Sequence, residues 1–151
     1  MTVSVQETDF DCGAEIAALS TGDDEAGAVA SFVGLVRGGE ILAMTLEHYP
    51  GMTEQALLEI VDQASQRWEV RRVRVIHRVG RLAPGDQIVF VGVSSRHRGE
   101  AFSACEFIMD YLKTQAPFWK KEELTNGPSG GRWVDARESD EDAARRWSGG
   151  S

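Results

Sequence analysis

The sequence predicts a single-domain α+β protein in which a mainly antiparallel sheet packs against two principal helices. Apolar residues alternate over several short segments, as in strands that bury one face, and recur at helical spacing near residues 53–68 and 100–115. Strand-like and helix-like segments do not alternate strictly enough for a doubly wound parallel sheet. We expect the domain to cover residues 1–147 and residues 148–151 to form a flexible tail.

The first quarter of the chain predicts a strand, a short helix, a loop and a buried strand. Residues 2–6 alternate apolar and polar side chains, and Asp11 precedes a short apolar-periodic stretch, as expected of a capped helix. Residues 20–27 are polar and acidic, which indicates a loop. Small and β-branched residues dominate 27–36, so this segment predicts a buried strand that ends at Arg37.

The middle of the chain predicts a strand at 41–48, a Pro50-Gly51 turn and a helix with Thr53 as its N-cap. The apolar face of this helix would comprise Leu57, Ile60, Val61, Ala64 and Trp68. Residues 71–79 alternate valines and His77 with arginines. We therefore expect a half-exposed strand whose wet face carries Arg72, Arg74 and Arg78.

The last third predicts a turn at 84–86, an apolar strand at 87–94 and the second principal helix at 100–115, which Pro117 cannot continue. A loop at 126–131, a short strand at 133–136 and a brief helix capped by Asp140 would follow.

Composition excludes several classes of protein. The 151 residues are 42% hydrophobic and 26% charged, which is typical of a globular chain. A net charge of −8 repels phosphate backbones, so nucleic acid is not an expected partner. No apolar stretch approaches the ~20 residues that span a bilayer, and residues 1–11 lack the basic region of a signal peptide. We expect a cytoplasmic protein that does not bind membranes.

Cysteines and histidines give no metal-site pattern. Cys12 and Cys105 lie far apart in the sequence, which favours two reduced thiols over the alternative of a disulfide. His48 and His77 fit structural roles better than ligand roles. No spacing matches a metal site and no glycine-rich loop matches a nucleotide site, so neither a metal nor a cofactor is expected.

Three stretches place cations at the ends of predicted elements, where binding sites are usually built. Arg37 follows a buried strand, the His97-Arg98 pair lies between a strand and a helix, and Lys113 precedes the Pro117 break. Arginine binds phosphate or carboxylate through its planar fork, and histidine transfers protons near neutral pH. At each position a plain surface charge remains the alternative.

The pair Lys113 and Lys120 flanks the Pro117 break, which turns the chain so that the two amines need not diverge. Beside Phe118 and Trp119, two neighbouring amines would lower the pKa of at least one of them, and such a lysine acts as base or nucleophile. The alternative is two solvated lysines, of which Lys113 complements the helix dipole.

At these same residues the sequence closely resembles the catalytic (large) subunits of molybdopterin synthase. The resemblance runs from about Gly27 to Trp147, and long ordered matches make it specific. The matching segments are GAVASFVGLVR (27–37), LEHYPGM (46–52), VIHRVG (75–80), GDQIVFVGVSSRHRGEAF (85–102), FIMDYLKTQAPFWKKE (107–122) and WVDARESD (133–140).

The resemblance implies a hammerhead-like α+β fold and a sulfurtransferase. Such enzymes add two sulfurs to cyclic pyranopterin monophosphate, which makes the dithiolene of molybdopterin. The sulfur arrives as a thiocarboxylate on the C-terminal Gly-Gly of a small ubiquitin-like partner. Two large subunits form a homodimer with a small subunit at each end, a heterotetramer, and each pocket takes residues from both large subunits.

By the same resemblance, Lys113 and Lys120 match the catalytic lysines, with Lys113 as acid/base or covalent amine and Lys120 as the group that holds the thiocarboxylate or an oxyanion. The substrate pocket would comprise Arg37, His97, Arg98, Arg137, Phe32 and Met109. An alternative is a non-catalytic module that binds the ubiquitin-like sulfur carrier, because the loop after Arg37 is short.

Overall fold

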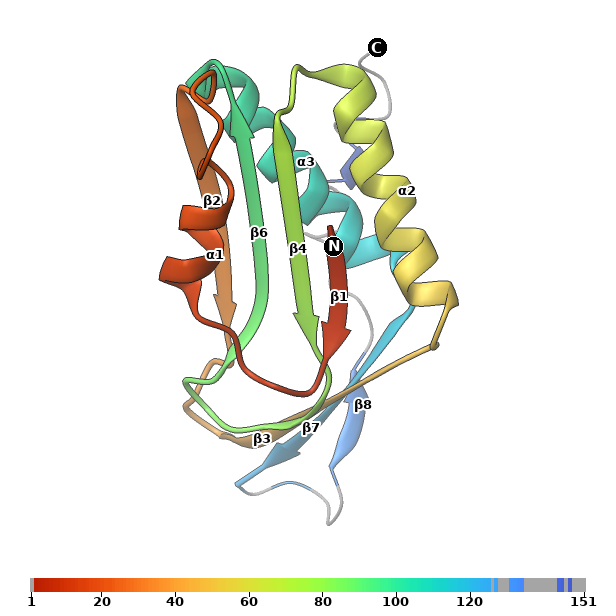
Figure 1. Cartoon of the computed structure of the whole chain (residues 1–151). Coiled ribbons are helices and arrows are strands. Elements are labelled where there is room, and N and C mark those ends of the chain that lie inside the picture. Colours follow the sequence, from red (N-terminus) through yellow and green to blue (C-terminus); the bar gives the residue numbers. More distant parts are fainter. Residues whose placement is uncertain (1, 126, 128–130, 135–143, 146, 148–151) are drawn as a thin grey trace.

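The computed structural model describes residues 2–125, 127, 131–134, 144–145 and 147. Arg137, Asp140 and the predicted tail at 148–151 lie outside these residues, as does the end of the strand predicted at 133–136. In chain order the elements are β1 (Val3–Gln6), α1 (Cys12–Ala18), β2 (Ala28–Leu35), β3 (Ile41–His48), α2 (Met52–Arg67), β4 (Arg72–Arg78), β5 (Gly80–Leu82), β6 (Gln87–Ser95), α3 (Arg98–Gln115), β7 (Phe118–Leu124) and β8 (Arg132–Val134) (Figure 1).

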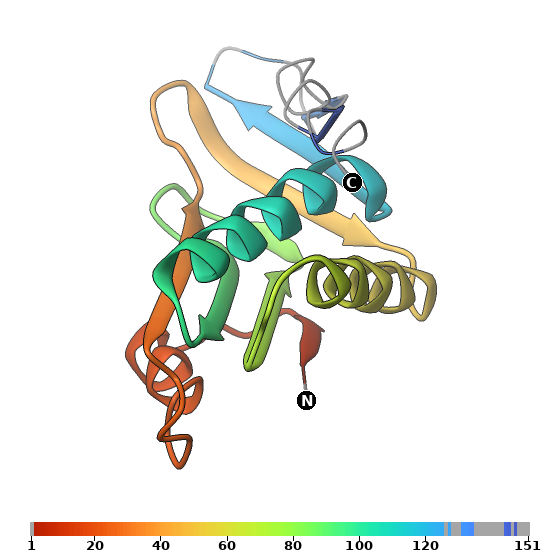
Figure 2. The same cartoon turned by 90° about the horizontal axis from the view of Figure 1, so that it is seen from above.

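The first sheet has the strand order β1-β4-β6-β2 and leaves β2 at one edge. The β1–β4 pair is parallel, and the other two pairs are antiparallel. Helices α2 and α3 cover one face, and α1 lies on the opposite face (Figures 1 and 2). The main core lies under α2 and α3 and includes Leu57, Ile60, Val75, Val91, Phe107 and Ile108.

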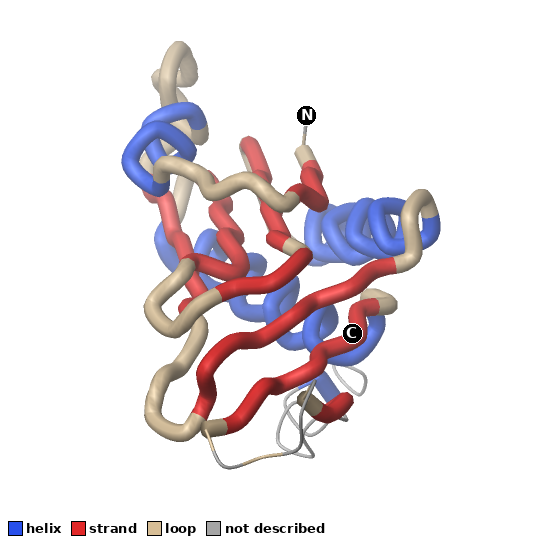
Figure 3. Tube along the Cα trace, turned by 90° about the horizontal axis from the view of Figure 1, so that it is seen from below, coloured by secondary structure: helices blue, strands red, loops and turns tan. Residues whose placement is uncertain are grey.

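A second, fully antiparallel sheet has the order β5-β3-β7-β8 and lies beside the C-terminal end of α3 (Figure 3). A smaller apolar cluster, which contains Val36, Met44, Leu46, Val79 and Leu82 with Phe118 packed against it, joins the two sheets. The predicted fold class is confirmed: a mainly antiparallel α+β fold with two principal helices. The division into two sheets was not predicted.

The N-terminal end of α2 differs from the prediction. The helix begins at Met52, and its N-cap is Gly51, whose φ of +85° suits glycine in the turn after Pro50. The Glu54 carboxylate accepts a hydrogen bond from the Gly51 N–H at 3.0 Å. Thr53 is therefore not the N-cap. Its buried hydroxyl accepts the Tyr49 N–H at 2.9 Å and donates to the Pro117 carbonyl at 3.0 Å.

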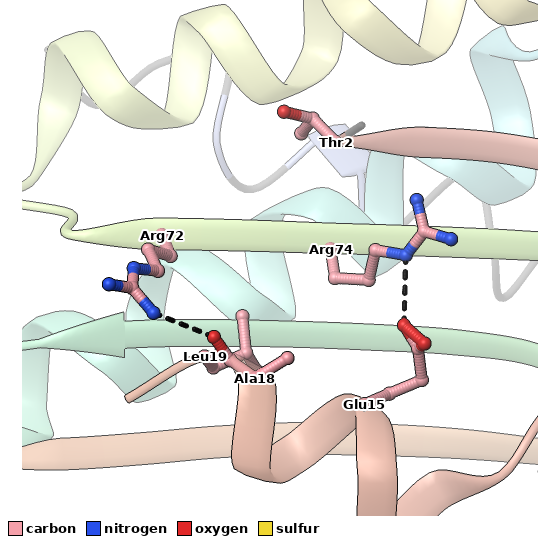
Figure 4. Close-up of a pocket in the computed structure, with 6 residues that line it drawn as sticks. All are labelled: Thr2, Glu15, Ala18, Leu19, Arg72 and Arg74. Atoms are coloured by element: carbon pink, nitrogen blue, oxygen red, sulfur yellow. Dashed lines mark hydrogen bonds and ion pairs between the residues drawn. The ribbon is translucent and has the colours of Figure 1, made fainter. Parts of the chain in front are cut away.

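The strand is half-exposed as predicted, but the arginines of β4 are half-buried rather than freely solvated, because α1 and the loops before and after it contact them. Arg74 pairs with Glu15 at 3.0 Å, and Arg72 donates to the Ala18 carbonyl at 2.8 Å (Figure 4). These residues line a pocket of about 410 Å³ on the α1 face of the sheet. These arginine contacts thus hold the N-terminal segment against the sheet.

Strand β7 was also not predicted. Its segment FWKKEEL is mostly charged and follows Pro117, so it carries little apolar alternation. It pairs with β3 and places Lys120 opposite Leu46 and Phe118 opposite His48. Among the described helices, none is long and apolar enough to cross a membrane.

Candidate active site

A pocket of about 490 Å³ lies between the edge strand β2 and helix α3. Three of the predicted site residues, Phe32, Met109 and Lys113, line it. The complete lining is Ala30, Ser31, Phe32, Phe102, Cys105, Glu106, Met109, Asp110 and Lys113. The pocket therefore combines an apolar floor with one ammonium and two carboxylates, a composition suited to a substrate that is partly polar.

Lys113 lies in the last turn of α3 and is exposed. A cation is favoured there by the negative end of the helix dipole. Its charge also acts on the buried His77 of β4. Burial, together with the nearby charges of Lys113 and His48, lowers the pKa of His77 to about 4. The imidazole is therefore neutral at physiological pH.

The two lysines are joined by a braced turn, residues 116–118, called here the Pro117 turn. The Thr53 hydroxyl holds the Pro117 carbonyl, and the Phe118 ring stacks on His77 with centroids 3.8 Å apart. Along β7, Phe118 and Lys120 point to the same face, since side chains alternate along a strand. His77 thus interacts with both Lys113 and the segment that carries Lys120, which places the two lysines at the same end of the fold.

His97 and Arg98 lie at the other end of α3. His97 is the N-cap of this helix and Arg98 its first residue, and both are exposed. At about 1.5 Å per residue, roughly 22 Å of helix separates Arg98 from Lys113. Within one chain, these residues cannot act on the same small molecule as Lys113.

Arg37 is exposed and follows the end of β2. Because Ala28 pairs with Ser95 and Leu35 with Gln87, Arg37 and His97 lie at opposite ends of the β2–β6 pair. The predicted cations therefore do not form a single cluster within one chain.

The sequence reasoning missed several residues that line the pocket, notably Phe102, Glu106 and Asp110. Phe102 is 64% exposed, unusual for so large an apolar side chain. The sequence does carry a signal for Phe102 and Glu106. Positions 102, 106, 109 and 113 are three or four residues apart, so these residues lie on the same face of a helix as Lys113.

The two cysteines are free, as predicted. Cys105 is buried in the pocket floor, where burial raises its thiol pKa to about 12, so it is not poised as a nucleophile. Among the described residues, no group of histidine, cysteine and carboxylate side chains could hold a metal ion.

Comparisons with known proteins identify the family. The family model described as MoaE protein matches residues 5–115. The molybdopterin synthase catalytic subunit of Ralstonia nicotianae is 63% identical over 150 residues, which cover 97% of this chain and 84% of that protein.

Solved structures agree. The molybdopterin biosynthesis MoaE protein from Burkholderia ambifaria MC40-6 has a TM-score of 0.84 and 55% identity over 97% of each chain. A complex of subunits 1 and 2 of molybdopterin-converting factor from Helicobacter pylori 26695 matches with a TM-score of 0.72 over 90% of each chain, at 19% identity, and shows the fold alone. This chain therefore belongs to the family of molybdopterin synthase catalytic subunits, the enzymes that convert cyclic pyranopterin monophosphate to molybdopterin.

Proposed function

We propose that this enzyme takes its sulfur from the thiocarboxylated Gly-Gly C-terminus of a small ubiquitin-like subunit and transfers it to the pterin in the pocket between β2 and α3. The observation that carries the proposal is that Lys113 lines this pocket while Lys120 follows the adjoining Pro117 turn. Both the phosphorylated pterin and the thiocarboxylate are anions, and ammonium groups on an otherwise acidic protein attract them locally.

We further propose that the working unit is a homodimer, with a small subunit at each end. The reason is the helix length: Arg98 and Lys113 of one chain are about 22 Å apart, but Arg98 of one copy can serve the Lys113 pocket of the other. The β2 edge and the neighbouring face of α3 present exposed apolar side chains that suit burial in such a contact, namely Phe32, Leu35 and Phe102.

In the proposed reaction, each transfer forms a bond between the thiocarboxylate sulfur and a pterin carbon, while a carbon–oxygen bond at that carbon breaks and its oxygen takes up a proton and leaves as a hydroxyl or phosphate group. Water then cleaves the acyl carbon–sulfur bond, which leaves a carboxylate on the partner and sulfur on the pterin. Lys113 moves the proton as acid/base, or holds the substrate as a covalent amine. Lys120 stabilises the negative oxygen that develops on the acyl carbon.

The arginines bind the substrate in this proposal. Arg37, Arg98 and Arg137 would hold the phosphate through planar hydrogen-bonding forks, and His97 would add a further donor. Phe32 and Met109 would pack against the pterin ring. Two free cysteines suit a reducing compartment, in line with a cytoplasmic enzyme.

The test is mass spectrometry of the pterin after the purified chain has been incubated with cyclic pyranopterin monophosphate and a thiocarboxylated small subunit. We expect a product that has gained two sulfurs and a partner that has lost its thiocarboxylate. An unmodified partner carrying a plain carboxylate is the control. Unchanged pterin in the complete reaction would refute the proposed sulfur source.

A further inference from the structure

Residues 95–98, called here the His97 turn, connect β6 to α3 and carry His97 and Arg98. Both side chains are exposed at the protein surface. The turn is held by its other residues, Ser95 and Arg96, which contact the segment between α2 and β4. The residue that makes these contacts is Glu69.

Glu69 binds the His97 turn through both its carboxylate and its carbonyl. The carboxylate accepts the Arg96 N–H at 3.2 Å and lies 2.9 Å from the Ser95 hydroxyl oxygen. The Glu69 carbonyl oxygen lies 2.7 Å from the same hydroxyl. An ion pair at 3.6 Å joins the carboxylate to the Arg96 guanidinium.

The Ser95 hydroxyl also connects Glu69 to His97 by a hydrogen bond. Ser95 is fully buried, and its oxygen accepts the His97 N–H at 3.3 Å. Because the hydroxyl proton is directed at Glu69, the oxygen lone pairs remain available to that amide. Hydrogen bonds therefore run from Glu69 to Ser95 and on to the backbone of His97, the N-cap of α3.

A second set of contacts holds the other side of the turn. Glu25 pairs with Arg96 at 2.8 Å and with Arg71 at 3.4 Å, and the Gly27 N–H donates to the Ser95 carbonyl at 2.9 Å. These contacts reach Arg96 and the Ser95 backbone but not the Ser95 hydroxyl. Only Glu69, among the described residues, is hydrogen-bonded to that hydroxyl as its acceptor.

We propose that Glu69 is a positioning residue, which acts through Ser95 to fix the backbone of His97 and Arg98 for substrate binding. The proposal rests on the proposed function, in which these two residues meet the pterin phosphate. Preorganised donors bind an anion without first losing conformational freedom, so a loosened turn weakens binding while the chemical step on the lysines is unaffected.

The charge state of Glu69 fits this role. Hydrogen bonds from the Arg96 backbone and the Ser95 side chain keep the pKa of the Glu69 carboxyl below its usual value. The group is therefore an ionised acceptor throughout the neutral range.

The experiment compares Glu69→Ala with Glu59→Ala, a matched loss of an exposed glutamate on α2. Steady-state kinetics with the thiocarboxylated partner should show KM for the pterin raised about tenfold in Glu69→Ala, with kcat within about twofold of wild type, because a charge-assisted hydrogen bond is lost. Glu69→Gln, whose amide oxygen can still accept both hydrogen bonds, should restore most of the affinity. Glu59→Ala should match wild type.

Hydrogen–deuterium exchange of the free protein supplies a readout that needs neither substrate nor partner. We expect faster exchange at the Arg96 and His97 amides in Glu69→Ala and in Ser95→Ala, and unchanged exchange in Glu59→Ala. Wild-type exchange at these amides in Glu69→Ala would overturn the positioning role. An inactive wild-type enzyme with faster exchange in the variant would instead refute the proposed function and leave the positioning of the turn intact.

Discussion

The two ends of helix α3 carry the two groups of candidate site residues, and they are held in opposite ways. At the N-terminal end, ion pairs and the Ser95 hydroxyl brace the His97 turn near the surface. At the C-terminal end, the buried Thr53 hydroxyl and the neutral His77 ring brace the Pro117 turn. The comparison teaches that ion pairs and hydrogen bonds near the surface hold the first end, whereas buried groups of the core hold the second.

The largest expected effect is at the C-terminal end. Lys113→Ala removes the ammonium that lines the pocket, and we expect product formation to fall by about two to three orders of magnitude, the usual size of an acid–base or oxyanion contribution. The measurement is single-turnover sulfur transfer. Lys121→Ala is the control, because Lys121 lies on the other face of β7, over the Trp133 ring, and its loss should change the rate less than about twofold. Equal rates in the two variants would remove Lys113 from the mechanism.

Protonation of His77, at the C-terminal end of α3, makes the stability of the fold depend on pH. Its pKa is about 4 in the fold and near 6.5 once exposed, so the unfolded chain binds the additional proton between these values. The contribution of the neutral ring is complete above pH 6.5 and is lost as the pH falls to 4, a loss of about 3 kcal/mol. His77→Phe keeps an aromatic ring against Phe118 but cannot bind a proton.

Urea unfolding at a series of pH values from 7 to 4 measures this effect. The free energy of unfolding should fall less steeply with acid in His77→Phe than in wild type. Parallel curves for the two proteins would show that His77 is not buried in its neutral form.

The N-terminal end is sensitive to a single methyl group at Gly27. A Cβ there would lie 2.3 Å from the Arg96 carbonyl oxygen, so one backbone segment must move. We expect Gly27→Ala to cost about 2 kcal/mol in stability and to raise KM for the pterin more than it lowers kcat. Gly13→Ala, in α1 and away from the His97 turn, serves as the control. Wild-type kinetics in Gly27→Ala would show that the turn tolerates displacement.

The smallest expected effect concerns the Thr53 hydroxyl. Thr53→Val keeps the shape but leaves the Tyr49 N–H and the Pro117 carbonyl without this partner, at a cost of about 1 to 2 kcal/mol. Thr53→Ser retains the hydroxyl and should recover most of the stability. Thermal unfolding of both variants tests this, and a loss in Thr53→Ser as large as that in Thr53→Val would contradict the role given to the hydroxyl.

The fold could be predicted from sequence where apolar periodicity is strong. The strand at 87–94 and the helix at 100–115 were found within a few residues. Strand β7 was missed because its inward face mixes Phe118 and Leu124 with charged Lys120 and Glu122, so alternation of apolar and polar residues cannot reveal it. For β4 the alternation of apolar residues and arginines was clear and predicted a strand with a polar face. Periodicity does not reveal that a helix from another part of the sequence packs on that face.

The candidate site was predictable in its residue types but not in its geometry. Phe32, Met109 and Lys113 do meet in one pocket. The separation of Arg98 from Lys113 already follows from the length of the predicted helix, at about 1.5 Å per residue. No local sequence pattern predicts the contact between two copies that would bring Arg98 and Lys113 together, because this contact depends on surfaces distributed over β2 and α3.

Complementation between inactive copies tests the central claim, that each site combines opposite ends of α3 from two chains. Lys113→Ala and Arg98→Ala chains carrying different tags would be co-expressed and the mixed dimer purified. One of its two sites would then hold both lysines and Arg98, so we predict about half of wild-type activity, although each parent dimer is nearly inactive. A mixed dimer as inactive as its parents would contradict the shared site.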